Sequence, residues 1–174
     1  MIVIVSATNR TNAVSQHIAR QYAGILDEYN EANTILSLEH LPADFIVSAL
    51  YENVGKNQEF NQIREIMNNA SKLVFIIPEY NGSFPGVLKV FIDGLDRSKA
   101  LNEKKCAMVG ISSGDQGGAM AMSHFCDILN YCGAHVLGYR LRIPGIKNLM
   151  TDNRITSPEY LARLHKQIRQ LISF

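Results

Sequence analysis

Short apolar runs alternate with amphipathic stretches along the whole chain. Five runs of continuous apolar or β-branched residues lie at 2–5, 34–38, 73–77, 106–111 and 135–141. Such runs, without regular polar alternation, are typical of strands that are covered on both faces of a sheet. They predict five strands.

Between these runs, apolar residues recur every three or four positions, which predicts helices. Before the last stretch, Ser157 is a candidate cap and Pro158 suits the first helical position. The predicted helices cover the stripes at 14–29, 60–70, 87–95, 122–132 and 161–171. The remaining connection, 39–57, is the longest one predicted to be irregular, and it either overhangs the ligand site or is an ordinary surface loop.

This order of elements predicts an α/β fold with a doubly wound parallel sheet between two layers of helices. We expect five strands in the order 2-1-3-4-5, in one domain over 1–174. In that order the winding reverses between strands 1 and 3, and a crevice opens at their carboxyl ends. Three loops rich in Gly, Ser and Asn follow strands 1, 3 and 4, at 6–13, 78–86 and 112–118. The sequence therefore predicts one composite ligand site there.

Composition excludes several classes of protein. The chain has 17 basic and 16 acidic residues and no run of like charge, so neither nucleic acid nor a membrane surface is an expected partner. The longest predicted apolar strand is far shorter than the roughly 20 residues of a spanning helix, and no leader is evident, so we expect a cytoplasmic protein. Cys106, Cys126 and Cys132 are expected to be buried thiols, and the five histidines lack metal-ligand spacing.

The first loop has the chemistry of a phosphate site. A helix that begins near Asn12 would offer free amides and the positive end of its dipole to an anion. Ser6, Thr8 and Ser15 add hydroxyl groups, and Arg10 can make a bidentate charge-assisted contact. Because no G-x-G-x-x-G or G-x-x-x-x-G-K-[ST] pattern is present, a phosphate monoester fits better than a pyrophosphate or triphosphate. The alternative is a hydrated loop that merely caps the helix.

The second and third loops could hold a flat ring. Pro78 ends a strand, the pair 81–82 forms a tight turn, and the amides of 79–83 are expected to face the edge of a heterocycle. Tyr80 would either stack on the ring or support the loop. Ser112 and its neighbours would close the other edge of the ring.

The motifs of both loops resemble one known family. Ser-x-Thr-Asn-Arg at 6–10 and Pro-Glu-Tyr-Asn-Gly-Ser-Phe-Pro-Gly-Val-Leu-Lys-x-x-Ile-Asp at 78–93 resemble the NADPH-dependent FMN reductases. These flavodoxin-like proteins include azoreductase-like proteins and quinone or chromate reductases. The resemblance implies noncovalent FMN as cofactor. The cofactor-binding residues that it implies are Ser6, Thr8, Asn9, Arg10, Ser15, Pro78, Glu79, Tyr80, Asn81, Gly82, Ser83, Ser112, Ser113 and Gly114.

The resemblance also implies a homodimer or homotetramer in which the helix at 87–97 packs against a partner. Relatives commonly carry Trp after Ile-Asp, whereas this chain has Gly94, which would thin that contact. The implied activity is hydride transfer from NADPH or NADH through flavin N5 to a flavin, quinone, azo compound or metal oxyanion, with ping-pong kinetics and no catalytic side chain. Arg97, Lys99 and Lys147 either hold a 2′-phosphate or remain solvated surface charges.

Two other functional classes stay open. One is a flavin-binding electron carrier or sensor without turnover. The other is a serine hydrolase, because Gly-Ile-Ser-Ser-Gly at 110–114 follows a predicted strand. In that case Ser112 would be the nucleophile, with Asp127 or Asp152 and His165 as its partners.

Overall fold

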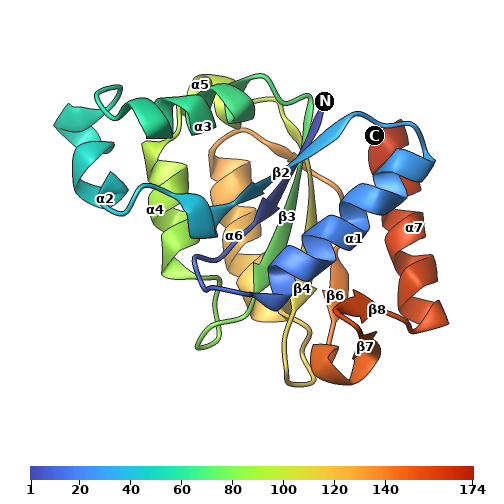
Figure 1. Cartoon of the computed structure of the whole chain (residues 1–174). Coiled ribbons are helices and arrows are strands. Elements are labelled where there is room, and N and C mark those ends of the chain that lie inside the picture. The colour runs from blue at the N-terminus through green and yellow to red at the C-terminus, as the bar shows by residue number, and fades with distance from the viewer.

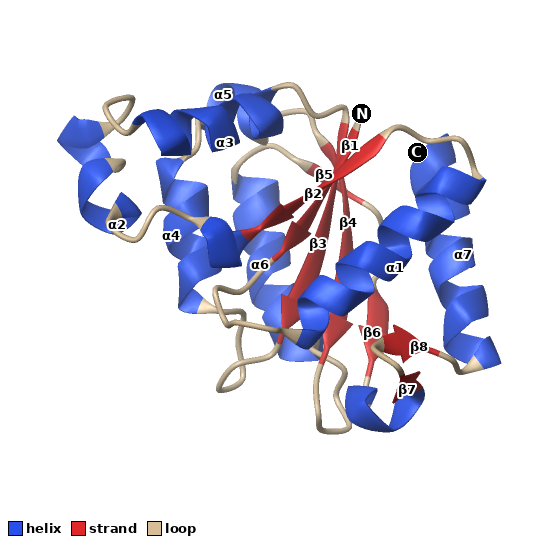
Figure 2. Cartoon of the chain, in the orientation of Figure 1, coloured by secondary structure: helices blue, strands red, loops and turns tan.

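Two layers of helices enclose a central parallel sheet, as predicted. A computed structural model describes residues 1–174. In Figures 1 and 2 one pair of helices covers one face of the sheet, and the other long helices cover the opposite face. The strands of the sheet are β1 (Ile2–Ser6), β2 (Asn33–Ser37), β3 (Lys72–Pro78), β4 (Lys105–Ile111), β5 (His135–Val136) and β6 (Leu141–Ile143). The order β2-β1-β3-β4-β5 confirms the predicted topology, and β6 also pairs with β4.

Helices lie against both faces of this sheet, and the sheet separates two hydrophobic cores. α1 and α7 pack on one face with Ile2 and Ile4 of β1, whereas Val3 and Val5 face α3, α4 and α6. The helices are α1 (Val14–Glu28), α2 (Phe45–Ser48), α3 (Gln58–Asn68), α4 (Gly86–Gly94), α5 (Arg97–Ala100), α6 (Ala119–Tyr131) and α7 (Pro158–Ser173). Because β1 is buried on both faces, its run of apolar residues is continuous.

The region 39–57 is more regular than predicted. It contains α2 and the 3₁₀ turn η2 (Tyr51–Asn53), and a further 3₁₀ turn, η1 (Leu38–His40), leads into it. Phe45 of α2 is buried and stacks on Phe60 of α3, with 5.5 Å between ring centroids. This contact holds the segment against α3, whereas four-residue helices would not form alone.

The predicted strand 135–141 is not continuous. Residues 137–140 leave the sheet and separate β5 from β6. Gln167 of α7 is fully buried at this break. Its side-chain amide donates hydrogen bonds to Met108 O at 2.9 Å and to Tyr139 O at 2.8 Å. The Gln167 side chain thus provides these two backbone carbonyls with the hydrogen bonds that a continuous strand would have supplied.

The chain beyond β6 forms a 3₁₀ turn and a small hairpin before α7. These elements are η3 (Ile146–Leu149), β7 (Met150–Thr151) and β8 (Arg154–Ile155). The amides of Gly145 and Ile146 donate to Gly114 O and Ser112 O, both at 3.0 Å. These bonds hold η3 beside the loop that follows β4. No helix of the molecule is both long and apolar enough to cross a bilayer.

The last helix, α7, begins where the sequence predicts it. α7 begins with Pro158 at its first turn, after Ser157 at the cap position. The Ser157 side chain, however, makes no capping hydrogen bond. At α3 the cap is complete, because the Phe60 amide donates to Asn57 Oδ1 at 2.9 Å.

Candidate functional site

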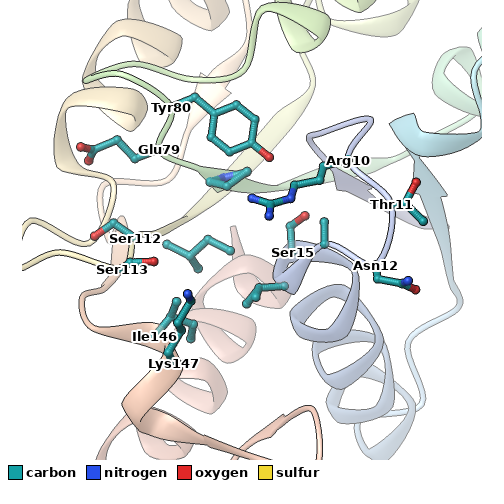
Figure 3. A pocket seen from close by; sticks show the side chains of 14 residues that line it. Arg10, Thr11, Asn12, Ser15, Glu79, Tyr80, Ser112, Ser113, Ile146 and Lys147 are labelled. Carbon is teal, nitrogen blue, oxygen red and sulfur yellow. The ribbon is translucent and has the colours of Figure 1, made fainter.

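A cavity of about 530 Å³ lies at the carboxyl ends of the central strands, where the sequence predicts a ligand site. Figure 3 shows its side chains, which come from the ends of β3 and β4, the start of α1 and η3. The lining residues are Arg10, Thr11, Asn12, Ala13, Val14, Ser15, Pro78, Glu79, Tyr80, Ile111, Ser112, Ser113, Ile146 and Lys147. Three loops meet there, and we call them the β1–α1 loop (residues 7–13), the β3–α4 loop (79–85) and the β4–α6 loop (112–118).

The β1–α1 loop ends in free backbone donors. The amides of Thr11, Asn12, Val14 and Ser15 donate no hydrogen bond within the protein. Asn12 adopts a positive φ of 53°, and α1 begins two residues later. Unpaired N–H groups at the positive end of a helix dipole form an anion site.

Two cations line this cavity without an acidic partner. Four ion pairs form in the structure, and neither Arg10 nor Lys147 takes part in any of them. In Figure 3 the two side chains approach from different walls, Arg10 above the α1 start and Lys147 below Ser113. Both charges are therefore available to an anionic ligand.

The hydroxyl groups expected to bind phosphate are mostly engaged within the protein. Ser6 and Thr8 are only 1% exposed and do not line the cavity. Ser6 Oγ lies 3.0 Å from Ser15 Oγ, and Thr8 Oγ1 lies 2.9 Å from Tyr80 Oη. The Arg10 amide also donates to Thr8 Oγ1, at 3.3 Å. These hydroxyls hold the loop together.

The β3–α4 loop pairs three of its six amides within the protein. Glu79 N donates to Ile111 O at 3.0 Å, while Tyr80 and Ser83 exchange two backbone hydrogen bonds of 2.8 and 3.1 Å. Asn81 and Gly82 between them have φ values of 51° and 77°, which makes this a tight hairpin turn of the I′ type. Of the expected donors at 79–83, only the amides of Asn81 and Gly82 remain free.

One acceptor on this side of the cavity has no partner. Glu79 lines the cavity, and its Oε2 atom is buried without a hydrogen bond. Burying an acceptor without a partner costs free energy, about 1–3 kcal/mol for a neutral group and more for a charged one. In Figure 3 the Glu79 carboxylate points away from Arg10 and the middle of the cavity.

In the β4–α6 loop the hydroxyl of Ser112 organises the backbone. It donates to Gly114 O at 2.8 Å and accepts from Gly117 N at 2.9 Å. His165, the histidine that a hydrolase would need, is hydrogen-bonded to Tyr29 Oη at 3.3 Å instead. No base contacts Ser112, so nothing in the geometry favours the hydrolase reading.

The structure brings seven of the fourteen implied cofactor-binding residues to the cavity wall. Those are Arg10, Ser15, Pro78, Glu79, Tyr80, Ser112 and Ser113. Ser6, Thr8, Asn9, Asn81, Gly82, Ser83 and Gly114 belong to the same loops but lie outside the lining. None of the residues 39–57 lines it either.

Seven further lining residues were not among the predicted ones. Thr11 to Val14 follow directly from the expected anion site at the start of α1, and Ile111 ends the predicted strand. Ile146 and Lys147 lie outside the three predicted loops, and the pairing of β6 with β4, together with the amide bonds of Gly145 and Ile146, places η3 at the site; of the two, the sequence named only Lys147, as a candidate for a 2′-phosphate.

The cysteines lie outside this cavity, and no metal cluster is present. Burial raises the pKa of the Cys106 thiol to about 12, so the thiol stays protonated near neutral pH. All three cysteines are free and buried. No three His, Cys, Asp or Glu side chains gather where they could hold a metal ion.

Known structures share this fold over nearly the full chain. The flavoenzyme NAD(P)H:(acceptor) oxidoreductase FerB of Paracoccus denitrificans superposes with a TM-score of 0.77 at 18% identity, covering 99% of this chain and 94% of that one. An archaeal flavodoxin superposes with a TM-score of 0.64 at 14% identity, covering 99% and 95% of the two chains. At these identities the likeness establishes a flavodoxin-like fold.

Two curated proteins match in sequence. An NAD(P)H-dependent FMN reductase of Pseudomonas aeruginosa is 37% identical over 78 residues, which cover 44% of this chain and 42% of that protein. An NADPH azoreductase of a Bacillus species is 26% identical over 129 residues, which cover 70% and 64% of the two. The matches thus span less than two thirds of either relative.

The family model for NADPH-dependent FMN reductases matches residues 1–145, a stretch that includes all three loops of the cavity. This match covers well over half of the chain, and it agrees with the sheet order, the two loop motifs and the free anion site at the start of α1. The chain therefore belongs to the NADPH-dependent FMN reductase family.

Proposed function

We propose that this protein is an FMN-containing oxidoreductase that passes a hydride from NAD(P)H to a small acceptor. The observation that carries the proposal is the row of free amides at the start of α1, beside the unpaired Arg10, at the end of a cavity. We further propose that residues 1–174 act as one flavodoxin-like FMN-binding domain.

The residues of the cavity fit FMN at both ends. A phosphate monoester carries nearly two negative charges, which suits the amides of 11–15 and the guanidinium of Arg10. At the other end, Ser112 and Ser113 line the wall where the edge of the flavin ring would lie. Pro78 and Tyr80 line the wall between these ends.

When bound, FMN would supply the hydride-accepting N5 atom, and the protein's part is to hold and orient the ring. Two walls of the cavity are held by hydrogen bonds before the ligand arrives. One is the turn at 80–83, closed by its two backbone bonds, and the other is the β4–α6 loop, held by the Ser112 hydroxyl. Preorganised walls reduce the entropy lost on binding.

We propose a ping-pong order for the reaction. The chain has no dinucleotide fingerprint, so NAD(P)H and the acceptor would use the same opening in turn. Flavins, quinones, azo compounds and metal oxyanions are the proposed acceptors, and the names of the two curated relatives point to the first and third of these. Parallel lines in double-reciprocal plots would support this order, and intersecting lines would contradict it.

We also propose a homodimer or homotetramer that assembles through α4 and α6. An apolar groove between them is lined by Ile92, Leu95 and Ile128, and Tyr131 beside it is 79% exposed. The rim of the groove carries both acidic and basic side chains, so two copies of this surface can pair opposite charges when they meet. Gly94 faces inward, where an added Cβ would lie 2.7 Å from Phe60, so this glycine does not thin the outer contact as expected. An Ile128→Arg variant that keeps its fold but sediments as a monomer would support this interface.

Spectroscopy and turnover test the main proposal together. The purified protein, or the protein reconstituted with FMN, should absorb at about 450 nm and bleach under anaerobic NADPH. Steady NADPH oxidation with added quinone distinguishes an enzyme from an electron carrier, which would bleach without turnover. If the protein neither binds FMN nor oxidises NADPH, the proposal is wrong.

A further inference from the structure

One hydrogen-bonded contact joins the two halves of the cavity. Tyr80 lies in the β3–α4 loop and Thr8 in the β1–α1 loop, 72 residues apart, yet their hydroxyl oxygens are 2.9 Å apart. Thr8 is 1% exposed, so little water competes for this bond. Figure 3 shows the Tyr80 hydroxyl directed toward the side of the cavity where Arg10 lies.

The contact continues to the anion site through the backbone. Thr8 Oγ1 also accepts the amide of Arg10 at 3.3 Å, and Thr8 N donates to Ser6 O at 3.0 Å. Beyond Ser6, the β1–α1 loop has few internal hydrogen bonds, because its later amides are free. The Thr8 hydroxyl is therefore one of the few groups that fix the backbone from which Arg10 projects.

The opposite end of the contact is rigid. Tyr80 and Ser83 are paired through two backbone hydrogen bonds, and Ser83 Oγ lies 3.0 Å from His124 Nδ1 on α6. Phe84 packs against Phe125 of α6 with 5.4 Å between ring centroids. The β3–α4 loop can thus act as an anchor for the less constrained β1–α1 loop.

We propose that Tyr80 is a positioning residue for the phosphate half of the site, acting through Thr8 on the segment that carries Arg10. This inference rests on the proposed function, because it takes FMN as the ligand. Tyr80 then has two roles: its ring lines the cavity, and its hydroxyl holds the phosphate-binding backbone in the geometry that binds an anion. Removing the hydroxyl alone separates the two.

Riboflavin provides the probe, because it has the ring and ribityl chain of FMN but no phosphate. Apoprotein is titrated with each flavin, and the quenching of flavin fluorescence gives the two Kd values. In Tyr80→Phe the Kd for FMN should rise about fivefold, the typical effect of one lost hydrogen bond, while the Kd for riboflavin changes less than twofold. Thr8→Val should give the same selective loss, and Thr8→Ser, which keeps the hydroxyl, should retain most of the FMN affinity.

The double variant tests whether the two hydroxyls act as one unit. If they do, Tyr80→Phe combined with Thr8→Val should weaken FMN binding no more than either change alone. Tyr29→Phe is the matched control, because it removes a hydrogen-bonded tyrosine hydroxyl outside the cavity; it should leave both Kd values nearly unchanged. Circular dichroism and melting temperatures confirm that each variant folds.

Two sets of results would overturn the inference. Equal effects of Tyr80→Phe on FMN and riboflavin, no effect on either, or additive losses in the double variant would show that Tyr80 does not act through Thr8. If the wild-type protein binds neither flavin, the proposed function itself fails, and the inference fails with it.

Discussion

The start of α1, with the end of the β1–α1 loop before it, leaves a group of amides free, whereas the β3–α4 loop pairs three of its six amides. In the first region the amides of Thr11, Asn12, Val14 and Ser15 lack a partner, and Arg10 has no carboxylate. In the second, Glu79, Tyr80 and Ser83 all donate within the protein. The first loop can therefore bind by charge and backbone donors, and the second mainly by shape.

This difference suits the two parts of the proposed ligand, FMN. A phosphate group needs several donors at once, and a helix start supplies them without side chains. A flat ring needs a wall that does not move, and a hairpin turn with satisfied backbone supplies that. Substitutions that change the backbone should therefore act mainly on the ring side of the cavity. Substitutions that change charge should act mainly on the phosphate side.

The largest expected effect comes from a backbone change on the ring side, at Gly117 in the β4–α6 loop. An added Cβ at Gly117, where φ is 59°, would lie 2.9 Å from Arg142 Cβ and from two backbone nitrogens. Gly117→Ala should lower the free energy of unfolding by about 3 kcal/mol and the Tm by roughly 10 °C. Calorimetry measures this. Gly114→Ala in the same loop is the control, since nothing lies within 4 Å of its added Cβ; equal losses in both would contradict a rigid wall at Gly117.

The next effect tests the phosphate side through its charge. Arg10→Glu places a carboxylate beside the free amides, so the Kd for FMN should rise about 50-fold, roughly 2.3 kcal/mol, with little change for riboflavin. Fluorescence titration measures both constants. Arg20→Glu reverses an exposed charge on α1, outside the cavity, and should leave FMN binding nearly unchanged. A comparable loss of riboflavin binding would mean that Arg10 does not act on phosphate.

Alkaline pH should affect both halves equally, because its targets lie in the core. Burial raises the pKa of Cys106 to about 12 and also raises the pKa of Tyr22. Above pH about 8.5 the unfolded chain loses thiol protons that the folded chain keeps, so stability falls as pH rises. Cys106 alone should contribute a loss of about 2 kcal/mol by pH 10.

Urea unfolding at pH 8 and pH 10 measures this loss. Cys106→Ala removes the titrating thiol and should flatten the dependence on pH. A stability that stays constant up to pH 10 in the wild-type protein would contradict the raised pKa.

The smallest effect concerns Lys147, which lines the cavity on the side of the β4–α6 loop but carries a charge. If its ammonium group acts on phosphate, Lys147→Met should raise the Kd for FMN about threefold and leave the Kd for riboflavin unchanged, as expected for one exposed charge. Lys56→Met, at an exposed lysine outside this cavity, controls for net charge. Equal changes for both flavins would place Lys147 against the ring instead.

Most of the fold could be predicted because it depends on local patterns. The run at 73–77 is fully buried, and continuous burial on both faces of a sheet leaves a continuous apolar run in the sequence. The break at 137–140 could not be predicted in this way. It depends on Gln167, which reaches the gap from a helix about 30 residues later.

The candidate site was predictable as a place and only partly as a set of residues. The loops at 6–13, 78–86 and 112–118 meet where the winding of the sheet predicts. Yet Thr8 is buried against Tyr80, and of the three cations considered for a 2′-phosphate only Lys147 lines the cavity.

The pattern of residues along the chain was enough to predict the alternation of strands and helices, the edge of the sheet at which the candidate site lies and the family to which the chain belongs. Which hydroxyls and amides at that site stay free became visible in the folded molecule alone. Apolar periodicity acts over a few residues, whereas a hydrogen-bond donor is free or engaged according to partners that the fold brings from far along the chain.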